Sequence, residues 1–347
     1  MLANHLFEYP HEFKLESGKT LPGFQLAYTT YGELNKEKNN VVWVCHALTA
    51  NSDFTEWWPD LFGPGKLYDP TKHFVICANM LGGCYGSTGP LSPNPRTGVP
   101  FFHSFPQITN RDVVNTFELL RNDLGLDQIH TILGGSMGGQ QALEWTIEKP
   151  DLFENLVIVA SNAKHSAWGI AFNETQRQAI KQDLTWKLNT ERAGLNGMKV
   201  ARAIALLSYR SHLTYDLTQS EETDEVFDGY KASSYQVYQG EKLASRFNAF
   251  TYWILSKAMD SHNVGRKREG IAKALKQIKA NALFVGIDND VLFPVKEQEF
   301  LAKHIENASF HVIDSKYGHD GFLIEMSKLT EKIQLFYKQK KLKPVLV

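Results

Sequence analysis

Short apolar runs rich in Val and Ile recur along the chain and are separated by amphipathic or loop-like segments. Continuous apolar runs of this length are typical of strands buried on both faces of a parallel sheet. Residues 24–32 instead alternate apolar and polar positions with the two-residue period of a strand. The pattern therefore predicts strands at residues 24–32, 41–47, 73–81, 129–135, 156–161, 282–287 and 310–313.

Helical periodicity fills the spaces between these predicted strands. In residues 111–125 an apolar stripe recurs at helical spacing from Val113 to Leu124, and Gly125 ends the segment. Residues 140–149 predict a second helix, and residues 320–339 predict an amphipathic helix that closes the chain. Alternation of strands and helices indicates an α/β fold with a mostly parallel sheet.

The middle of the chain differs from both flanks. No proline occurs between Pro150 and Pro294, and residues 166–183, 197–211, 234–260 and 267–278 read as helices. We expect a helical cap at residues 162–280, inserted between two parts of the sheet domain, residues 1–161 and 281–347.

Bulk properties narrow the class of protein. The net charge is −1 with 43% hydrophobic residues, which does not suggest a nucleic-acid or membrane-surface partner. No apolar run reaches the roughly 18 residues of a membrane span, and the first residues lack the apolar core of a signal peptide. Cys45, Cys77 and Cys84 do not form a disulfide framework. We expect a cytoplasmic protein without a metal or a resident cofactor.

The first candidate catalytic motif lies at the junction between the predicted strand at 129–135 and the helix that follows. Residues 134–138, Gly-Gly-Ser-Met-Gly, match the G-x-S-x-G nucleophile elbow. Glycine two residues on either side of the serine lets strand and helix approach closely enough for the sharp turn. Ser136 is the candidate nucleophile. A glycine-rich turn without chemistry is the structural alternative, and a phosphate loop is disfavoured because no G-K-[ST] follows.

A serine nucleophile on this kind of fold needs an acid and then a histidine later in the chain. His304 reads as a solvated helix residue and His311 as a strand residue, whereas His319 lies in a loop between strand and helix. We expect His319 to be the base. Asp288 and Asp290 both follow the strand at 282–287, and position alone does not choose between them.

The transition state also needs two backbone N–H donors. Met137, directly after the nucleophile, predicts one of them, and Leu48, in the loop after the strand at 41–47, predicts the other. Cys84 is an alternative nucleophile, but its surroundings carry no signature of a cysteine hydrolase.

Several motifs together resemble the homoserine O-acetyltransferase family of α/β-hydrolase-fold acyltransferases. They span about residues 40–325 and read CHALTANSDFTEWW, FGPGK, FVICANMLGGCYGSTGP, GGSMGGQQALEW, AKHSAWGIAFNETQRQAI and YGHDGFLIE. The resemblance implies an α/β-hydrolase fold with an inserted helical cap. It implies acyl transfer from a CoA thioester, most directly acetyl-CoA, to the hydroxyl of L-homoserine in methionine biosynthesis, and a homodimer formed through the cap.

The resemblance also assigns residues. It selects Asp290 as the acid and implies that Arg177 and Asp320 bind the substrate amino acid, as a cation for the carboxylate and an anion for the ammonium group. The plain alternatives are a surface arginine on a helix and an N-cap aspartate. The segment Arg246–Tyr252 reads RFNAFTY where the family commonly has RFDANSY, and this puts details of the cap and the choice of acyl group in doubt.

Other functions remain open at this stage. An esterase or thioesterase would use the same triad with water as the acceptor, but it has no need of a zwitterion clamp. A succinyl-CoA donor or an L-serine acceptor would keep the transferase chemistry. A non-catalytic binding module is disfavoured by the complete set of serine, acid and histidine.

Overall fold

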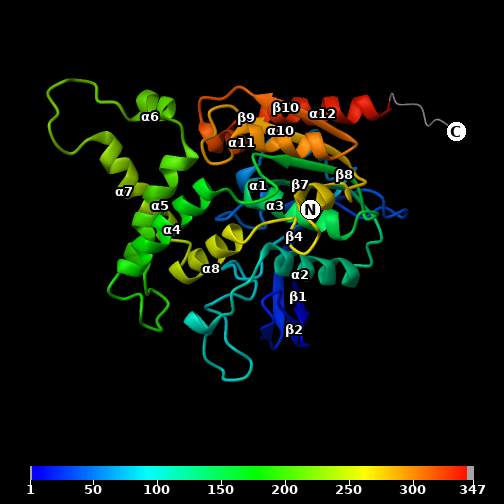
Figure 1. Ribbon diagram of the computed structural model, residues 1–347, viewed down its shortest axis with the longest axis horizontal. Helices are drawn as coiled ribbons and strands as arrows, with labels where there is room; N and C mark the ends of the chain where they lie inside the picture. The colour runs from blue at the N-terminus through cyan, green and yellow to red at the C-terminus, as the bar shows by residue number, and fades with distance from the viewer. Residues whose placement is uncertain (1, 342–347) are drawn as a thin grey trace.

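The computed structural model describes residues 2–341. Within them one eight-stranded sheet runs in the order β1-β4-β6-β5-β7-β8-β9-β10, and β2 and β3 form a separate short hairpin (Figure 1). The sheet is parallel from β6 to β10, while β1 and β4 are antiparallel at one edge. The strands are β1 Leu2–Tyr9, β2 Phe13–Lys14, β3 Thr20–Leu21, β4 Phe24–Tyr31, β5 Val41–Cys45, β6 Phe74–Ala78, β7 Ile129–Gly135, β8 Phe153–Val159, β9 Asn281–Ile287 and β10 Ala308–Ile313.

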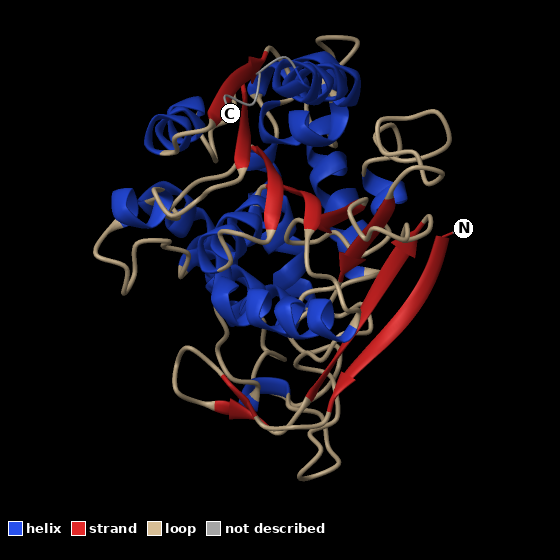
Figure 2. Cartoon of the chain, turned by 90° about the vertical axis from the view of Figure 1, so that its right-hand side faces the viewer, coloured by secondary structure: helices blue, strands red, loops and turns tan. Residues whose placement is uncertain are grey.

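Helices cover both faces of this sheet (Figure 2). All five residues of β5 are buried, as a continuous apolar run predicts, and they alternate between two apolar clusters. Trp43 packs with Phe117 of α2 and Trp145 of α3 on one face. Val42 and Val44 belong to the cluster that includes Phe336 of α12 on the other face. The α/β-hydrolase architecture predicted from the sequence is confirmed.

Apart from the helices that project from the sheet, the helices occur between or after the strands, and one of them, at residues 271–275, lies inside the predicted cap range of 162–280. They are α1 Phe54–Trp57, α2 Asn110–Asp123, α3 Met137–Glu148, α9 Ile271–Leu275, α10 Val295–His304, α11 Gly321–Ile324 and α12 Met326–Lys341, with the short 3₁₀ turns η1 Phe102–Ser104 and η2 Gly318–Asp320. No helix in the described part of the chain is long and apolar enough to cross a membrane.

A group of helices between β8 and β9 projects from the sheet, at the left of Figure 1. Two backbone bonds, His165 N–H to His262 O at 3.0 Å and Val264 N–H to Ala163 O at 3.0 Å, join the chain where it leaves the sheet and where it returns. The predicted cap limits, 162 and 280, fall in the segments after β8 and before β9. The projecting helices are α4 Ala167–Gln182, α5 Leu195–Tyr209, α6 His212–Gln219, α7 Lys231–Ala244 and α8 Ala249–Asp260.

Three details differ from the sequence prediction. The single helix expected at 234–260 is two helices, because Asn248 accepts a hydrogen bond from the Thr251 N–H and caps α8. The closing helix is broken at Glu325, so that η2 and α11 precede α12. The edge strand β1 and the helix α6 were not predicted, since neither contains a long apolar run.

Candidate active site

Ser136 lies in the turn between β7 and α3 with φ 56° and ψ −126°. A positive φ is uncommon for a residue that has a side chain, and it is held here only because the surrounding structure determines the turn. Its carbonyl oxygen accepts a 2.8 Å bond from the Ser161 hydroxyl, and its N–H donates to Val159 O at 3.0 Å. Hydrogen bonds to the end of β8 and to the segment that follows it therefore hold Ser136 in this strained conformation.

The glycines around Ser136 are required by close backbone contacts. A Cβ on Gly134 would lie 2.4 Å from the carbonyl carbon of Gly138, so strand and helix touch across the turn. A Cβ on Gly138 would lie 2.0 Å from Cys45 O, and one on Gly139 would lie 2.6 Å from the Ser161 Cβ. The predicted close approach of β7 and α3 is present, and it extends to the end of β5.

The structure brings Ser136, His319 and Asp290 together from three separate segments. His319 Nε2 lies 2.9 Å from Ser136 Oγ, and His319 Nδ1 lies 2.7 Å from Asp290 Oδ2. All three side chains are buried. In the neutral state the serine hydroxyl donates to Nε2 and the Nδ1–H donates to the carboxylate. This is the geometry of a nucleophile, a base and an orienting acid.

Asp290, rather than Asp288, meets the histidine. Asp288 is exposed, whereas Asp290 is 5% exposed. The second carboxylate oxygen of Asp290 accepts the N–H groups of Leu292 and Phe293, both at 2.8 Å. These two bonds fix the carboxylate plane, so that the other oxygen faces His319.

The imidazole of His319 is held between aromatic rings. Phe293 stacks on it with 5.1 Å between ring centroids, and Phe322 and Tyr209 lie tilted at 5.1 and 5.8 Å. His304 is instead on α10, and His311 is on the edge strand β10. The loop position that favoured His319 in the sequence is the one that reaches the serine.

The two predicted oxyanion donors occupy neighbouring strand ends. Met137 is the first residue of α3, and Leu48 is a buried residue of the loop after β5. β5 and β7 pair in parallel with Cys45 opposite Gly134, so both N–H groups belong to segments that leave the same edge of the sheet. Their part in catalysis stays a prediction.

Asp320 follows the base directly and faces the cap. Its carboxylate is 3.1 Å from Arg210 Nε, and burial raises its pKa while Arg202 and Arg210 act in the opposite direction. It belongs to a pocket of about 270 Å³, here called the cationic pocket. The polar lining of the cationic pocket is Arg202, Arg210, Gln239, Lys242, Arg246 and Asp320.

Arg177 is not part of that pocket. It is a buried residue of α4 whose guanidinium donates to Glu174, Asp260 and the Ser256 hydroxyl. Arg177 and Asp320 do not line the same pocket, and the predicted role of Arg177 in binding the substrate carboxylate stays a prediction.

Arg202 and Arg210, the arginines beside Asp320, were not predicted from the sequence as site residues. Arg202 lies on α5 with its guanidinium 5.4 Å from the Tyr209 ring, and Tyr209 in turn faces His319. Arg210 immediately follows α5. The available signal was an arginine inside an otherwise apolar helical run, since an unpaired charge on such a face needs a partner or a ligand.

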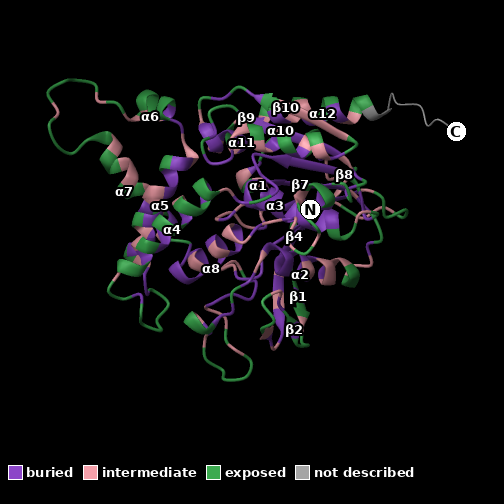
Figure 3. Cartoon of the chain, in the orientation of Figure 1, coloured by how far each residue is buried: buried purple, intermediate pink, exposed green. Residues whose placement is uncertain are grey.

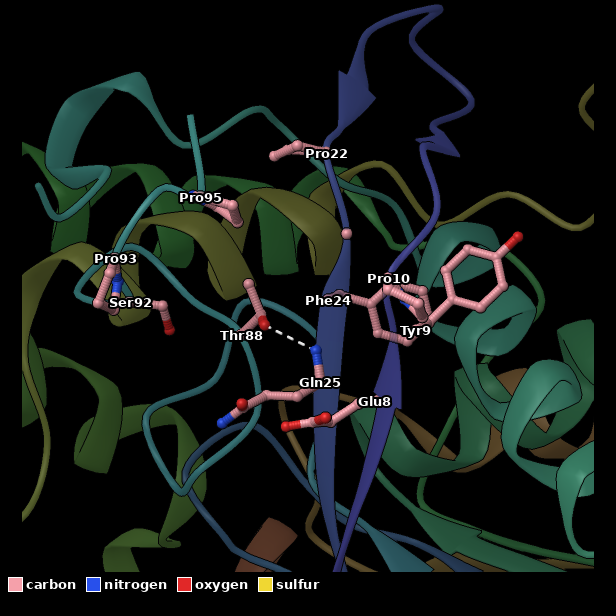
Figure 4. Close-up of a pocket in the computed structure, with 11 residues that line it drawn as sticks. Glu8, Tyr9, Pro10, Pro22, Phe24, Gln25, Thr88, Ser92, Pro93 and Pro95 are labelled. Carbon is pink, nitrogen blue, oxygen red and sulfur yellow. Dashed lines mark hydrogen bonds between the residues drawn. The ribbon is translucent and has the colours of Figure 1, made fainter. Parts of the chain in front are cut away.

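Other candidate sites are distinct from the triad. A pocket of about 360 Å³ between β1, β4 and the proline-rich loop is lined by Tyr9, Phe24 and several prolines, with Glu8 at one side (Figure 4). Burial raises the pKa of the Cys84 thiol to about 12, so it remains protonated. No group of three or more metal-ligating side chains is arranged for a metal ion in residues 2–341.

Comparison with known proteins gives the same fold and a specific family. A family profile for the alpha/beta hydrolase fold matches residues 40–325. Homoserine O-acetyltransferase of Cyclobacterium marinum is 50% identical over 336 residues, which is 97% of this chain and 95% of that protein.

Two solved structures share the fold at 24% identity. Homoserine O-acetyltransferase from Bacillus anthracis aligns with a TM-score of 0.89 over 97% of both chains. Esterase E22 aligns with a TM-score of 0.88 over 97% of this chain and 100% of that one. Proteins of this fold are thus named both as esterases and as homoserine O-acetyltransferases. The family of this chain is decided by its 50% identity to the Cyclobacterium marinum protein. The chain belongs to the homoserine O-acetyltransferase family of the α/β-hydrolase fold.

Proposed function

We propose that this protein transfers an acyl group from a CoA thioester to the hydroxyl of L-homoserine through an acyl-serine intermediate. The observation that carries the proposal is the junction at His319 and Asp320. One residue completes a buried triad with Ser136 and Asp290, and the next lines a pocket that contains both an anion and several cations. A plain esterase has no use for such a pocket.

The first half-reaction forms the acyl-enzyme. His319 Nε2 takes the proton of Ser136 as Oγ attacks the thioester carbonyl, and Asp290 stabilises the imidazolium that results. The N–H groups of Leu48 and Met137 stabilise the tetrahedral oxyanion, and one such donor is typically worth roughly 2.7–4 kcal/mol. The carbon–sulfur bond then breaks, and the imidazolium returns the proton to the departing CoA thiolate.

The second half-reaction is the same chemistry with an alcohol. His319 takes the hydroxyl proton of homoserine as its oxygen attacks the acyl carbon, the bond to Ser136 Oγ breaks, and the proton returns to Ser136. Water would give hydrolysis instead. The triad is buried, and Tyr209 of α5 lies against His319. This burial supports transfer, since orientation and exclusion of water favour the bound alcohol.

The cationic pocket is our proposed binding site for the acceptor. Homoserine carries one carboxylate and one ammonium group, and a partly dry site needs a charge of opposite sign for each. Asp320 would pair with the ammonium group, and Arg202 with the carboxylate. Arg202 makes no side-chain hydrogen bond to the described residues, so its donors are free for a ligand, unlike those of Arg177.

Acetyl-CoA is the donor that we propose, with succinyl-CoA as the second candidate. One observation favours the second: Lys242 and Arg246 add cations to the pocket beyond those that homoserine requires. A distal carboxylate on the acyl group would use them. L-serine remains the alternative acceptor.

The test is a matrix of donors and acceptors. Acetyl-CoA and succinyl-CoA are each assayed with L-homoserine, with L-serine and with water alone, by release of free CoA. We expect the highest kcat/KM for acetyl-CoA with homoserine and slow release with water. Equal release with and without the amino acid would identify a thioesterase and overturn the proposal.

A homodimer formed through the cap is also proposed. Large apolar side chains are exposed on α5, α6 and α7, in the region at the left of Figure 3. They are Val200, Leu207, Leu213, Leu217, Val237 and Tyr238. Because such a cluster costs free energy when it faces water, we expect a second copy to cover it. Light scattering of the wild type and of Val237→Glu tests this, with a monomeric wild type overturning it. We further propose a cytoplasmic location and a role in methionine biosynthesis.

A further inference from the structure

His46 is a buried histidine that takes no part in the triad. It directly follows β5 and stands two residues before Leu48 in the loop that supplies the second proposed oxyanion donor. Its side chain is fully enclosed in the protein, and its residue is only 3% exposed. A polar ring in such a place needs partners on both of its nitrogens.

The hydrogen bonds of His46 determine its tautomer. The Met80 N–H donates to Nε2 at 3.2 Å, so Nε2 must carry a lone pair. Nδ1 therefore carries the hydrogen and donates it to Ala47 O at 2.9 Å. Burial lowers the pKa of His46 to about 4, so the ring remains neutral at physiological pH.

The carbonyl that His46 holds belongs to the same peptide unit as the Leu48 N–H. A peptide unit is planar, and in the trans form its carbonyl and its N–H point in opposite directions. The Ala50 N–H also donates to Ala47 O, at 3.1 Å, so the carbonyl is held from two sides. Fixing this oxygen fixes the direction in which the Leu48 N–H points.

Two further contacts hold the loop in place. The backbone of Cys45 rests directly on Gly138 of α3, where a Cβ would clash at 2.0 Å, so the loop lies against the nucleophile elbow. On the cap side, Arg246 donates to Thr49 O at 2.7 Å. Of these contacts, the hydrogen bond from the His46 ring to Ala47 O is the one that a side chain makes to the peptide unit carrying the Leu48 N–H.

We propose that His46 is a positioning residue that aims the Leu48 N–H at the oxyanion by holding the Ala47 carbonyl. The inference rests on the proposed acyl-serine chemistry. It predicts that both half-reactions depend equally on His46, since each passes through a tetrahedral oxyanion at the same place.

Two variants separate the two nitrogens of the ring. An asparagine amide can place its NH₂ near the position of Nδ1, whereas a glutamine amide places its oxygen near Nε2. His46→Asn can therefore keep the donor to Ala47 O, and His46→Gln can keep only the acceptor for Met80. We expect His46→Gln to lower the rates of acylation and deacylation by the same factor, roughly 10²-fold, and His46→Asn to lose roughly tenfold or less.

The measurements are the burst of CoA release without acceptor, the steady-state kinetics with homoserine, and the affinity for a boronic acid that forms a tetrahedral adduct with Ser136. We expect the boronate affinity of His46→Gln to fall in proportion to its kcat/KM, with an unchanged KM for homoserine. A merely structural histidine would lower the melting temperature of both variants alike without this proportionality.

The outcomes are distinguishable from a failure of the proposed function. The CoA burst and the boronate affinity do not involve homoserine, so they report on His46 even if the acceptor is another molecule. Equal losses for Asn and Gln, or an undiminished burst in His46→Gln, would overturn the inference.

Discussion

The sheet side and the cap side of the site hold their residues in different ways. On the sheet side, Asp290 accepts two backbone N–H groups and orients His319, which in turn meets Ser136. On the cap side, Arg202 lies against the ring of Tyr209 and near Asp320, and it makes no side-chain hydrogen bond to the described residues. The triad residues are held in place by bonds within the protein. In the cationic pocket, by contrast, the guanidinium of Arg202 has hydrogen-bond donors available to a ligand.

This difference suggests a division of tasks. The strand ends carry the triad, whose geometry serves acyl transfer to water and to an alcohol alike. The cap carries the charges that would choose an amino acid as the acceptor. Variants on the two sides should therefore fail in different steps, and the following predictions test that.

The largest effect is expected at the nucleophile. Ser136→Ala should lose nearly all activity with every acceptor, on the order of 10⁴-fold or more, while circular dichroism shows an unchanged fold. Cys84→Ala is the matched control and should retain activity. An enzyme that keeps half of its CoA release without Ser136 would remove this residue from the mechanism.

The second-largest loss of activity is expected when the triad acid, Asp290, is changed. Asp290→Asn leaves the two backbone bonds possible but favours the wrong imidazole tautomer, so we expect a loss of about 10⁴-fold in kcat for transfer and hydrolysis alike. Asp288→Asn removes an exposed carboxylate on the same loop and should be mild. The reverse ranking of the two variants would overturn the assignment of the acid.

A smaller and more selective effect is expected on the cap side. Arg202→Ala should leave the burst of CoA release intact and slow the second half-reaction, because losing a charged hydrogen bond of this kind costs roughly 1.5–3 kcal/mol, or ~10–150-fold. Rapid-quench kinetics separates the two steps. If the burst itself disappears, Arg202 serves the donor and the division of tasks fails.

Arg177→Ala sharpens the same comparison. Its loss would leave the Asp260 carboxylate buried without its cation, so we expect lower thermal stability and an unchanged homoserine KM in the protein that folds. Arg177→Lys keeps the charge and should be more stable. Loss of homoserine dependence in both variants, with Arg202→Ala unaffected, would support the role that the family resemblance implied for Arg177.

The smallest effect concerns a carboxyl near the triad acid. Burial, with Asp290 nearby, raises the pKa of Glu297 to about 7, so the folded state binds a proton that the unfolded state has already released above pH 4.5. The free energy of unfolding should therefore decrease as the pH rises from about 4.5 to 7. Glu297→Gln should flatten this part of the profile in urea titrations. Glu299→Gln, on the same helix, should leave it unchanged.

Local patterns were sufficient for much of this protein. The apolar runs predicted the central strands, because a residue buried on both faces of a sheet must be apolar at every position. The glycines around Ser136 predicted a close strand–helix turn, and they lie where side chains would collide. His319, which was preferred over the histidines on a helix and a strand because of its loop position, is the histidine that lies beside Ser136.

Other features were decided only by the tertiary structure. From the residues alone Asp288 and Asp290 were equivalent, and the fold separates them by exposing one and turning the other towards His319. Whether Arg177 and Asp320 can bind the two ends of one substrate molecule depends on how α4 and α5 lie over the sheet, which no local pattern encodes. Sequence determines which segments become strands, helices and sharp turns, because those depend on near neighbours. Which charges meet across the cap depends on the packing of distant segments, and that packing places Arg177 against Asp260 and Arg202 near Asp320.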